Sequence, residues 1–338
     1  NRFKGDRAMR TVKIGIMSFA HIHAFSYANC LKQMKEVEFV GIADDDITRG
    51  EKAAEQFETK LFPNYHALLD AVDAVIITAE NARHVDLAIA AAEAGKHILC
   101  EKPIATTIRD AQAMIDACKT HGVKLMTAFP CRFSPAMVKV KEHVDAGDIG
   151  TILAIKGTNR GKCPGGWFVD IEKSGGGAVI DHTVHVVDLM RWLLRSEPVE
   201  VYAEISNLIH HGNYDDVGML TITFENGVFA TLDTSWSRPE SYPTWGDVTM
   251  DITGTEGMIF MDMFAQNIIC YSDETMRTEW VNWGSNIDRA MILDFVSSIA
   301  NDVPVSVTGE DGLKALEVAL AAYKSSSTGS PVKLPLEQ

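Results

Sequence analysis

Acidic and imidazole side chains recur at helical spacing after a run of three glycines, and this segment is well suited to proton transfer. Asp181, His185 and Asp188 follow the glycines at 175–177 and are separated by four and three residues. In a helix, that spacing places the three side chains on one face. A carboxylate one turn from an imidazole can orient the ring or raise its pKa, so that the histidine exchanges protons near neutral pH. We therefore interpret His185 as a general acid or base that Asp181 holds in place.

Two other interpretations of this segment stay open. A histidine on an apolar helix is usually a structural core residue, and Asp181, His182 and His185 are also of metal-ligand type. Neighbouring residues point in different directions around a helix, so we expect the side chains of Asp181 and His182 to diverge. This expectation favours acid–base chemistry, and we predict no metal site.

A turn of the type that binds dinucleotides directly follows the first apolar run of the chain. It reads Gly15-Ile16-Met17-Ser18-Phe19-Ala20, whereas the dinucleotide fingerprint has glycine at its first and third positions and glycine or alanine at its sixth. Gly15 would permit the tight turn and Ala20 the close packing of helix on strand. Met17 replaces the glycine that lets the backbone approach the pyrophosphate, but the N–H groups of the following helix can still bind a phosphate. We expect a cofactor to contact Gly15, Met17, Ser18, Phe19 and Ala20; a tight turn without a ligand is the alternative.

Two further motifs lie where parallel-sheet proteins bind ligands. Asp44 ends a second apolar run, where a carboxylate can accept a hydrogen bond from a ribose 2′-hydroxyl and would repel a 2′-phosphate. It therefore favours NAD over NADP; a solvated turn at residues 44–46 is the alternative. Glu101-Lys102-Pro103 follows another apolar run, and the proline fixes the chain there through a peptide bond that can be cis. An exposed surface lysine is the alternative interpretation of Lys102.

Polar and aromatic residues typical of sugar-binding sites are scattered through the second half of the chain. Indole rings stack on the faces of sugars, and amide or ammonium groups bind hydroxyls, although aromatic residues at strand ends are more often core or interface residues. The set comprises Arg132, Asn159, Arg160, Lys162, Trp167, Trp236, Tyr242 and Trp245.

The elements that must position these residues alternate between strand and helix in the first half. We predict strands over 12–17, 37–43, 74–78, 97–100 and 123–128, and helices over 20–33, 47–57, 82–94 and 108–121. Asn81 is the expected cap of the third helix. This alternation indicates βαβ units and a parallel sheet, whose ligands bind outside the carboxyl ends of the strands.

The second half has a different pattern, which predicts an α+β domain with a mainly antiparallel sheet. Ser134 and Pro135 open a helix, and Glu225-Asn226-Gly227 marks a hairpin. We place the domain boundary near Ala128, giving domains at 9–128 and 129–338. The expected strands are 152–158, 199–206, 217–224, 228–236, 248–252, 258–261 and 268–271, and the expected helices are 178–194, 287–300 and 309–324.

Composition limits the classes of function. The 338 residues carry a net charge of −15, with 46% hydrophobic and 23% charged residues, which is ordinary globular composition and suits two domains. The acidic balance has the wrong sign for binding nucleic acid or an anionic membrane. A small polar substrate fits this chain better.

Cysteine usage and the N-terminus bear on location. Six cysteines at irregular spacing indicate reduced thiols in the cytoplasm. The sequence has no apolar run of transmembrane length, and residues 1–8 lack the apolar core of a signal peptide. We interpret those eight residues as an addition before a native start at Met9.

In the order and spacing of its motifs, the chain resembles the Gfo/Idh/MocA oxidoreductase family over nearly its whole length. The similarity lies in the turn after the first strand, the segments at 81–84, 94–103, 132–135 and 254–257, and the triple glycine with Asp181 and His185. The chain departs from the family pattern at Met17, at Pro130, where a polar residue often precedes the arginine, and at His182, where many members have a small or apolar residue.

The resemblance implies an α/β fold with an N-terminal Rossmann domain and a C-terminal α+β domain whose large open sheet often forms dimer or tetramer contacts. It also implies oxidation or reduction of a carbinol on a sugar, inositol or related polyol with NAD or NADP. Lys102 would touch the nicotinamide ribose and the reacting oxygen, and Asp181 and His185 match the family's catalytic pair. Thr78, Asn81, His84, Glu101 and Lys102 join the expected cofactor-binding residues. The expected substrate-binding residues are Arg132, Asn159, Lys162, Trp167, His182 and Tyr242.

We therefore expect a cytoplasmic, NAD(P)-dependent oxidoreductase, with NAD favoured, that moves a hydride between nicotinamide and a carbinol or ketone carbon. The expected partners are a polyol or sugar substrate and further copies of the chain in a homodimer or homotetramer, with no nucleic acid and no membrane. The alternatives are a non-catalytic sensor of dinucleotide or sugar, a metal-dependent hydrolase using Asp181, His182 and His185, and non-redox net chemistry with recycled NAD.

Overall fold

The computed structural model describes residues 10–274, 276–282 and 284–337, so the start expected at Met9 lies outside the described residues. The chain forms two compact units, each built from separate stretches of sequence. Unit 1 contains the chain up to Glu101, Gln112–Ala128 and Asp288–Gly309; unit 2 contains Lys102–Ala111, Phe129–Ile287 and the chain from Glu310 onward. The domain boundary near residue 128 stays a prediction.

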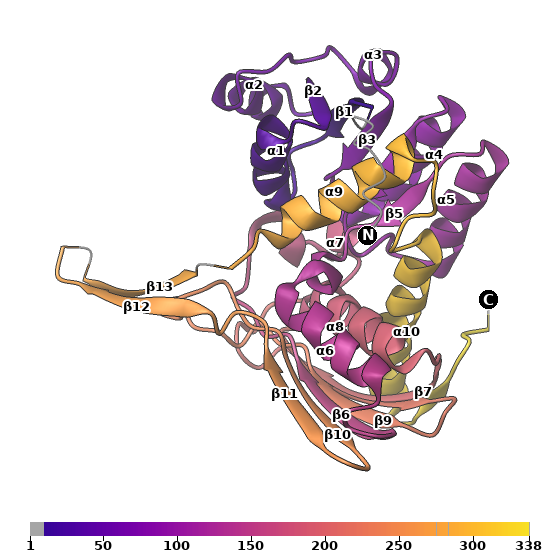
Figure 1. Ribbon diagram of the computed structural model, residues 1–338, viewed down its shortest axis with the longest axis vertical. Helices are drawn as coiled ribbons and strands as arrows, with labels where there is room; N and C mark the ends of the chain where they lie inside the picture. Colours follow the sequence, from indigo (N-terminus) through magenta and orange to yellow (C-terminus); the bar gives the residue numbers. More distant parts are fainter. Residues whose placement is uncertain (1–9, 275, 283, 338) are drawn as a thin grey trace, which may run out of the picture. The chain divides into compact units, whose positions relative to one another are not determined.

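Unit 1 is a five-stranded sheet in the order β2-β1-β3-β4-β5, and all its strand pairs are parallel, as the sequence predicts (Figure 1). The strands are β1 (Val12–Met17), β2 (Val37–Ala43), β3 (Ala74–Ile77), β4 (His97–Cys100) and β5 (Leu125–Thr127). The helices that begin before residue 128 are α1 (His23–Gln33), α2 (Ile47–Gln56), α3 (Tyr65–Leu69), the 3-10 turn η1 (Asn81–Arg83), α4 (His84–Glu93) and α5 (Ile108–Thr120), and α9 (Ile287–Ala300) returns from the far end of the chain.

The register of unit 1 aligns the carboxyl ends of three adjacent strands, β2, β1 and β3. Met17 at the end of β1 pairs with Ala43 of β2 on one side and with Ile77 of β3 on the other. All four side chains of β3 are buried, which is why this strand is a continuous apolar run without polar alternation. Because the three strands end level, the residues that follow them lie side by side at one edge of the sheet.

Three local predictions in unit 1 are wrong. Helix α1 begins at His23, three residues late, because Ser18 has a left-handed backbone (φ +73°) and the chain needs an extended turn after β1. Gly15 lies inside β1 and makes no turn; a Cβ there would be 2.6 Å from Leu68 Cδ1, so glycine is needed for close packing. Asn81 does not cap α4, since it is the first residue of η1.

The C-terminal return closes unit 1. Met126 of β5 forms a bridge with Thr308, and the Thr127 hydroxyl donates to the Thr308 carbonyl at 3.0 Å. Lys124 pairs with Asp302 at 3.1 Å. Sequence reasoning assigns this segment to the second half of the chain, and these contacts show why it packs with the parallel sheet.

Unit 2 is built on a seven-stranded sheet in the order β11-β10-β6-β9-β8-β7-β14, with one parallel pair, β6 and β9, among antiparallel ones. The β8–β9 hairpin turns at Gly227 (φ +83°), as expected. The strands are β6 (Ile152–Thr158), β7 (Pro198–Ser206), β8 (Val217–Phe224), β9 (Phe229–Asp233), β10 (Thr249–Gly254), β11 (Met258–Asp262) and β14 (Val332–Lys333). The helical segments are η2 (Pro130–Phe133), α6 (Pro135–Ala146), η3 (Gly166–Val169), α7 (Ile171–Ser174), α8 (Ala178–Leu194) and α10 (Gly309–Thr328).

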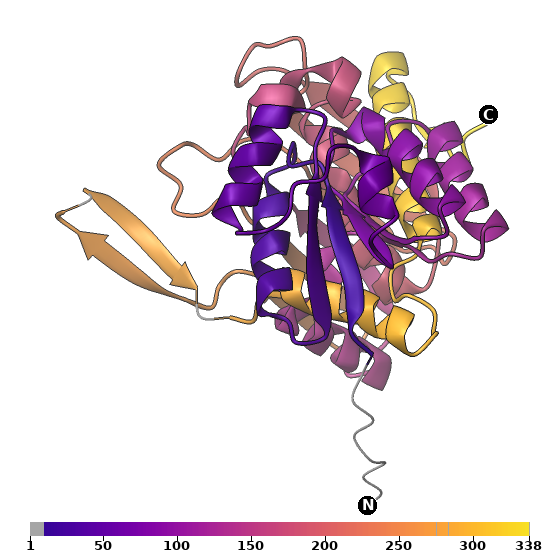
Figure 2. The ribbon, with the colours of Figure 1, turned by 90° about the horizontal axis from the view of Figure 1, so that it is seen from above.

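One strand of the expected meander leaves the main sheet. The segment predicted at 268–271 is β12 (Asn267–Ser272), which pairs with β13 (Arg277–Asn282) in a separate two-stranded hairpin (Figures 1 and 2). Sequence reasoning also missed α3, α7, β13 and the short edge strand β14. Ser134 does occupy the N-cap of α6, but its side chain makes no capping hydrogen bond.

Helix α8 covers one face of the large sheet and is almost wholly buried. Every residue from Ala178 to Met190 is buried. Glycines in the strands beneath let it approach, since a Cβ on Gly157 would lie 2.8 Å from Val186 and one on Gly218 would overlap Val179. The polar side chains of this helix are therefore held in an apolar setting, where each needs a partner.

All six cysteines lie in the described part of the chain and are unbridged, as the sequence predicts. Among the described residues, no helix has both the length and the apolar character required to cross a bilayer.

Candidate active site

A buried lysine–carboxylate pair forms the centre of the candidate site in unit 2. Lys102 Nζ lies 2.6 Å from Asp181 Oδ1 and 3.3 Å from the Asp181 carbonyl oxygen. Only 4% of Lys102 and 8% of Asp181 is exposed. A charge-assisted hydrogen bond this short, shielded from water, fixes the ammonium in one place. The peptide bond between Lys102 and Pro103 is cis.

Asp181 has two further partners, and one of them corrects a sequence prediction. Its Oδ2 lies 3.2 Å from His182 Nε2 and 3.3 Å from Trp236 Nε1. The expectation that Asp181 and His182 diverge around the helix is therefore wrong: their side chains converge. Burial disfavours the charged carboxylate, but Lys102 and His182 outweigh it and hold the pKa of Asp181 well below its usual range. Lys102 thus supplies a cation at this carboxylate.

His185 lies one turn further along α8 and faces different neighbours. Its Nδ1 is 4.0 Å from Cys131 Sγ, and its ring meets Phe129 edge-on at 5.9 Å between centroids. Only 6% of His185 is exposed. The carboxylate contacts given above lead from Asp181 to Lys102, His182 and Trp236, so an orienting role of Asp181 toward His185 stays a prediction.

The N-terminus of α8 is held by residues distant in sequence. Asp215 accepts from the Gly177 and Val179 N–H groups at 2.8 and 2.7 Å, and also from the Tyr323 hydroxyl at 2.8 Å. Tyr323 in turn accepts from the Ile180 N–H at 3.2 Å. Burial and Asp215 raise the pKa of Tyr323 well above its usual value, so the hydroxyl stays protonated.

The triple glycine is explained by this packing. Gly175 has a left-handed backbone (φ +83°), and a Cβ on Gly176 or Gly177 would overlap Tyr323 or the Asp215 carbonyl. The glycines therefore let two distant residues cap α8, and through α8 they set the position of Asp181.

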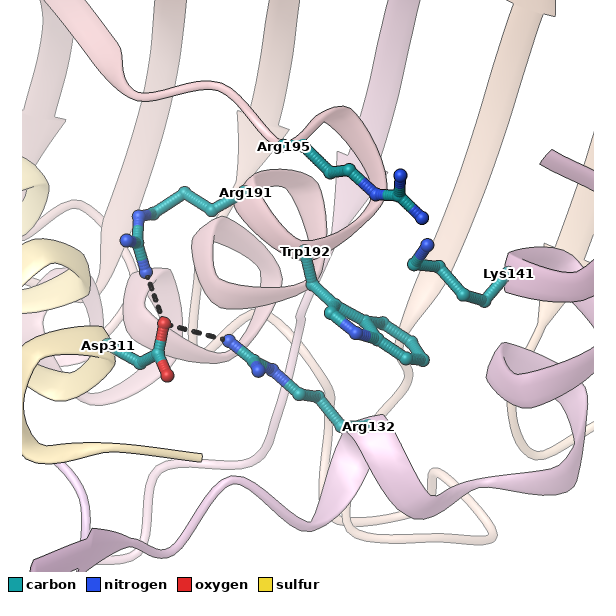
Figure 3. Close-up of a pocket in the computed structure, with 6 residues that line it drawn as sticks. All are labelled: Arg132, Lys141, Arg191, Trp192, Arg195 and Asp311. Atoms are coloured by element: carbon teal, nitrogen blue, oxygen red, sulfur yellow. Dashed lines mark hydrogen bonds and ion pairs between the residues drawn. The ribbon is translucent and has the colours of Figure 1, made fainter. Parts of the chain in front are cut away.

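Arg132, predicted to bind substrate, lies in an ion-pair network. Its Nε and Nη2 contact the two oxygens of Asp188 at 2.7 and 2.5 Å, and Nη2 is 3.2 Å from Asp311. Figure 3 shows Asp311 between Arg132 and Arg191, beside Trp192. These residues line a pocket of about 280 Å³ together with Lys141 and Arg195. Burial raises the pKa of Asp188 to about 6 in spite of Arg132. The second acid of this helical face, Asp188, thus pairs with an arginine rather than with a histidine.

The other residues predicted to bind substrate are spread over unit 2. Asn159 is fully buried and donates to the Asp247 carbonyl at 3.0 Å. Lys162 donates to the Glu240 carbonyl at 2.9 Å, and Trp167 stacks on Phe168 at 4.0 Å. Tyr242 lies between Arg238, at 4.1 Å, and Trp280, at 5.7 Å. The contacts described here join His182 to Asp181, but they bring neither Lys162 nor Trp167 to that carboxylate.

The predicted cofactor residues of unit 1 meet at the carboxyl edge of its sheet. The Thr78 hydroxyl donates to the Ser18 carbonyl at 2.6 Å, and the Phe19 N–H donates to Asp44 Oδ2 at 2.7 Å. Ala20 is next in this turn, whereas the side chain of Met17 is fully buried under it. Helix α1 follows with no acidic residue in its first turn, which suits an anionic group at its N-terminus.

Asp44 is a saturated acceptor. Besides Phe19, it accepts from the Asp46 N–H at 3.0 Å and from Arg49 Nε and Nη2 at 2.9 and 2.6 Å. Arg83 pairs with the neighbouring Asp45. Two arginines thus lie among the acids at the end of β2, and neither is evident from the turn motif alone.

The remaining cofactor candidates are buried. Asn81 and His84 are 3% and 0% exposed, and His84 Nε2 is 3.2 Å from the Ala79 carbonyl. Glu101 is fully buried and takes hydrogen bonds from Tyr27 and from His23 Nδ1, the latter at 2.9 Å. The turn geometry of this edge fits a bound dinucleotide, with backbone N–H groups for phosphates, whereas Asp44 can accept a ribose hydroxyl only by releasing one of its four present donors.

One group in unit 1 has the composition of a metal site. The ligand atoms of His21, His23 and Glu101 lie within 4.8 Å of one another. His21 Nδ1, however, accepts the His23 N–H at 3.1 Å. His21 Nε2 lies 3.9 Å from Glu101 Oε2, whereas His23 Nδ1 lies 2.9 Å from Glu101 Oε1.

The fold and the comparisons agree on the class of protein. Unit 1 holds a parallel sheet of the kind that binds nucleotides, and unit 2 holds a large mixed sheet. Residues 10–129 match the family described as "Oxidoreductase family, NAD-binding Rossmann fold", and residues 137–260 match the "GFO/IDH/MocA C-terminal domain". The chain therefore belongs to the GFO/IDH/MocA family of oxidoreductases.

Several named proteins are similar to the whole chain. A myo-inositol 2-dehydrogenase of Thermotoga maritima is 29% identical, with 96% of this chain and 98% of that protein covered. A scyllo-inositol 2-dehydrogenase (NAD(+)) of Bacillus subtilis is 28% identical, with 98% of each chain covered. Among solved structures, a levoglucosan dehydrogenase in complex with NADH and levoglucosan is 26% identical, with a TM-score of 0.84 and with 97% of this chain and 100% of that one covered.

Proposed function

We propose that the protein is an NAD-dependent dehydrogenase that interconverts a carbinol and a ketone on a sugar, inositol or related polyol. The Lys102–Asp181 pair carries this proposal, because a buried ammonium held at 2.6 Å by an ionised carboxylate is suited to stabilise an oxyanion. The names of the similar inositol dehydrogenases support the substrate class.

Each group has a separate task in this mechanism. Lys102 binds the reacting oxygen and stabilises the negative charge that develops on it, and Asp181 holds the ammonium in place. His185 takes the hydroxyl proton during oxidation and returns it during reduction. NAD, when bound, supplies the hydride acceptor, and the carbon–oxygen bond becomes a carbonyl as the proton and hydride leave. Ser18, Phe19, Asp44, Thr78, Asn81, His84 and Glu101 would hold the cofactor.

The preference for NAD over NADP rests on local charge. Asp44, Asp45, Asp46 and Glu80 surround Arg49 and Arg83, so the acids outnumber the arginines at the end of β2. A 2′-phosphate would add negative charge to this region, whereas a ribose hydroxyl would not.

We also propose that the outer face of the large sheet joins copies of the chain. On the face opposite α8, Met219, Phe229, Met258 and Phe260 are each more than half exposed. Apolar side chains gathered on a sheet face are typical of an interface. Light scattering of Phe260→Glu beside the unaltered protein tests this, and an unchanged oligomeric mass would refute it.

The function is tested with a panel of inositols, sugars and sugar acids, with NAD and NADP, by following absorbance of the reduced nicotinamide. Lys102→Met and His185→Asn are compared with Lys139→Met, which changes an exposed lysine on α6. Turnover that Lys102→Met abolishes and Lys139→Met leaves intact is expected. Near-normal turnover in both site variants would refute the assignment.

A further inference from the structure

We propose, resting on the proposed function, that His182 recognises a second substrate hydroxyl, one that does not react, by accepting its hydrogen bond at Nδ1. The site would thereby select a polyol with a hydroxyl donor beside the reacting carbinol. His182 departs from the family pattern, and its Nδ1 is an atom that the mechanism above leaves unused.

The first step is the division of the Asp181 carboxylate. Lys102 occupies Oδ1 at 2.6 Å, while Oδ2 lies 3.2 Å from His182 Nε2 and 3.3 Å from Trp236 Nε1. An ionised carboxylate accepts hydrogen bonds, so the imidazole must carry a proton on Nε2. Asp181 thereby fixes one tautomer, as carboxylates that support an imidazole do.

The second step concerns the other ring nitrogen. In the tautomer that donates from Nε2, Nδ1 carries a lone pair, so it can accept a hydrogen bond but cannot donate one.

The third step is that this lone pair is unused. His182 Nδ1 is buried and has no hydrogen-bond partner among the residues that the structure describes. Buried polar atoms are nearly always satisfied, and an exception calls for an explanation. A donor brought by a ligand satisfies it, and in the proposed substrate class that donor is a hydroxyl.

The ring is also held in a prepared position. Its edge-on neighbours are Trp236 and Trp245, at 6.5 and 6.3 Å between centroids. Gly161 leaves room for it, because a Cβ at that position would lie 2.6 Å from His182 Cε1. A side chain fixed by a carboxylate, two indoles and a glycine does not need to be ordered when substrate binds.

The experiment combines a change in the protein with a change in the substrate, as a double-mutant cycle does. KM and kcat are measured for myo-inositol and for D-glucose, and then for their monodeoxy and deoxyfluoro analogues, with the unaltered enzyme and with His182→Phe. His143→Phe is the matched control, since His143 is also paired with an aspartate, Asp148, but on the surface.

We expect His182→Phe to raise KM for the parent polyol about 10-fold or more, with a smaller change in kcat. For the analogue that lacks the recognised hydroxyl, the variant and the unaltered enzyme should have the same KM. A deoxyfluoro group accepts but does not donate, so it should behave as the deoxy group does. NADH binding, followed by nicotinamide fluorescence, should not change.

Two measurements keep the outcome decisive. Gly161→Ala displaces the imidazole without replacing it and should reproduce the KM effect if His182→Phe fails to fold. If His182→Phe raises KM equally for the parent polyol and for every analogue, the proposed role of His182 is overturned, while the proposed dehydrogenase function stands. If the unaltered enzyme turns over no polyol, the proposed function fails and this inference fails with it.

Discussion

Removing the carboxylate that caps α8 should destabilise unit 2 far more than removing an ordinary cap. Asp215→Ala deletes an acceptor of three hydrogen bonds, from Gly177 N–H, Val179 N–H and the Tyr323 hydroxyl, all at 2.7–2.8 Å. Each hydrogen bond to a charged group is worth roughly 1.5–3 kcal/mol when its partner stays buried. Asp215 is half-buried, so water replaces part of this, and a loss of about 3 kcal/mol is reasonable.

The assay is urea unfolding of the full chain, with thermal unfolding beside it. A loss of about 3 kcal/mol corresponds to a fall of roughly 6–12 °C in Tm for a unit of about 200 residues. Asp170→Ala is the matched control, because Asp170 also caps a helix by accepting a backbone N–H, from Glu172 at 3.2 Å, and its side chain is 40% exposed. The control should lose less than about 1 kcal/mol. Equal losses in the two variants would refute the reasoning that distant residues fix α8.

Asp215→Ala should also impair the proposed reaction, because α8 carries Asp181. Asp215→Asn retains one side-chain acceptor and should be intermediate in stability and in turnover. Full activity in Asp215→Ala, measured well below its unfolding temperature, would show that the cap does not position the site.

Three other perturbations have defined outcomes. Asp188→Asn removes a carboxyl whose pKa burial raises to about 6. Because this pKa is higher in the folded than in the unfolded chain, where it is near 4, the protonated carboxyl stabilises the fold at low pH, and this stability is lost as pH rises from about 4 through about 6. In urea titrations across that window, the unaltered protein should lose up to about 3 kcal/mol of unfolding free energy relative to the variant. Asp44→Ser should weaken NADH binding and reduce the difference in affinity between NADH and NADPH, both measured by nicotinamide fluorescence. An unchanged ratio of the two dissociation constants would count against Asp44 as the discriminating acid. Cys131→Val should lower kcat more than Cys131→Ser does, since only serine retains a polar partner for His185 Nδ1; equal kcat values would show that the contact at 4.0 Å is not used.

The parallel sheet could be predicted because its strands are short apolar runs that turns and helical segments clearly separate. Val12–Met17 and His97–Cys100 have the bounds expected from sequence, and so does the long buried helix Ala178–Leu194. These elements are buried on both faces or on most of their circumference, so local composition and final environment agree. The strand predicted over 268–271 does form, but it pairs with β13 and not with the main sheet. Strand pairing is decided by tertiary structure, which local composition does not encode.

The residues proposed for the candidate site could be singled out from the sequence, but their contacts could not. Lys102 and Asp181 are 79 residues apart, and their pairing follows from the fold of unit 2. His182 was expected to point away from Asp181. A carboxylate and the next side chain on a helix can still meet when both are buried in the same place, as these two are. Gly161 and Asp215 had no sequence signal of their own, since their importance lies in which side chains they accommodate or cap.

The way the chain returns to unit 1 has a consequence for synthesis. The bridge between Met126 and Thr308, the Thr127 hydrogen bond to the Thr308 carbonyl and the Lys124–Asp302 pair all require residues made after unit 2's main sheet. On the ribosome, the edge strand β5 must wait for more than 170 further residues, as the Lys124–Asp302 separation of 178 shows, before its outer partners emerge. A nascent chain stopped at residue 128 would expose an unpaired strand edge, a template for association with other chains. Completion of the nucleotide-binding half is thus timed by translation of the other half.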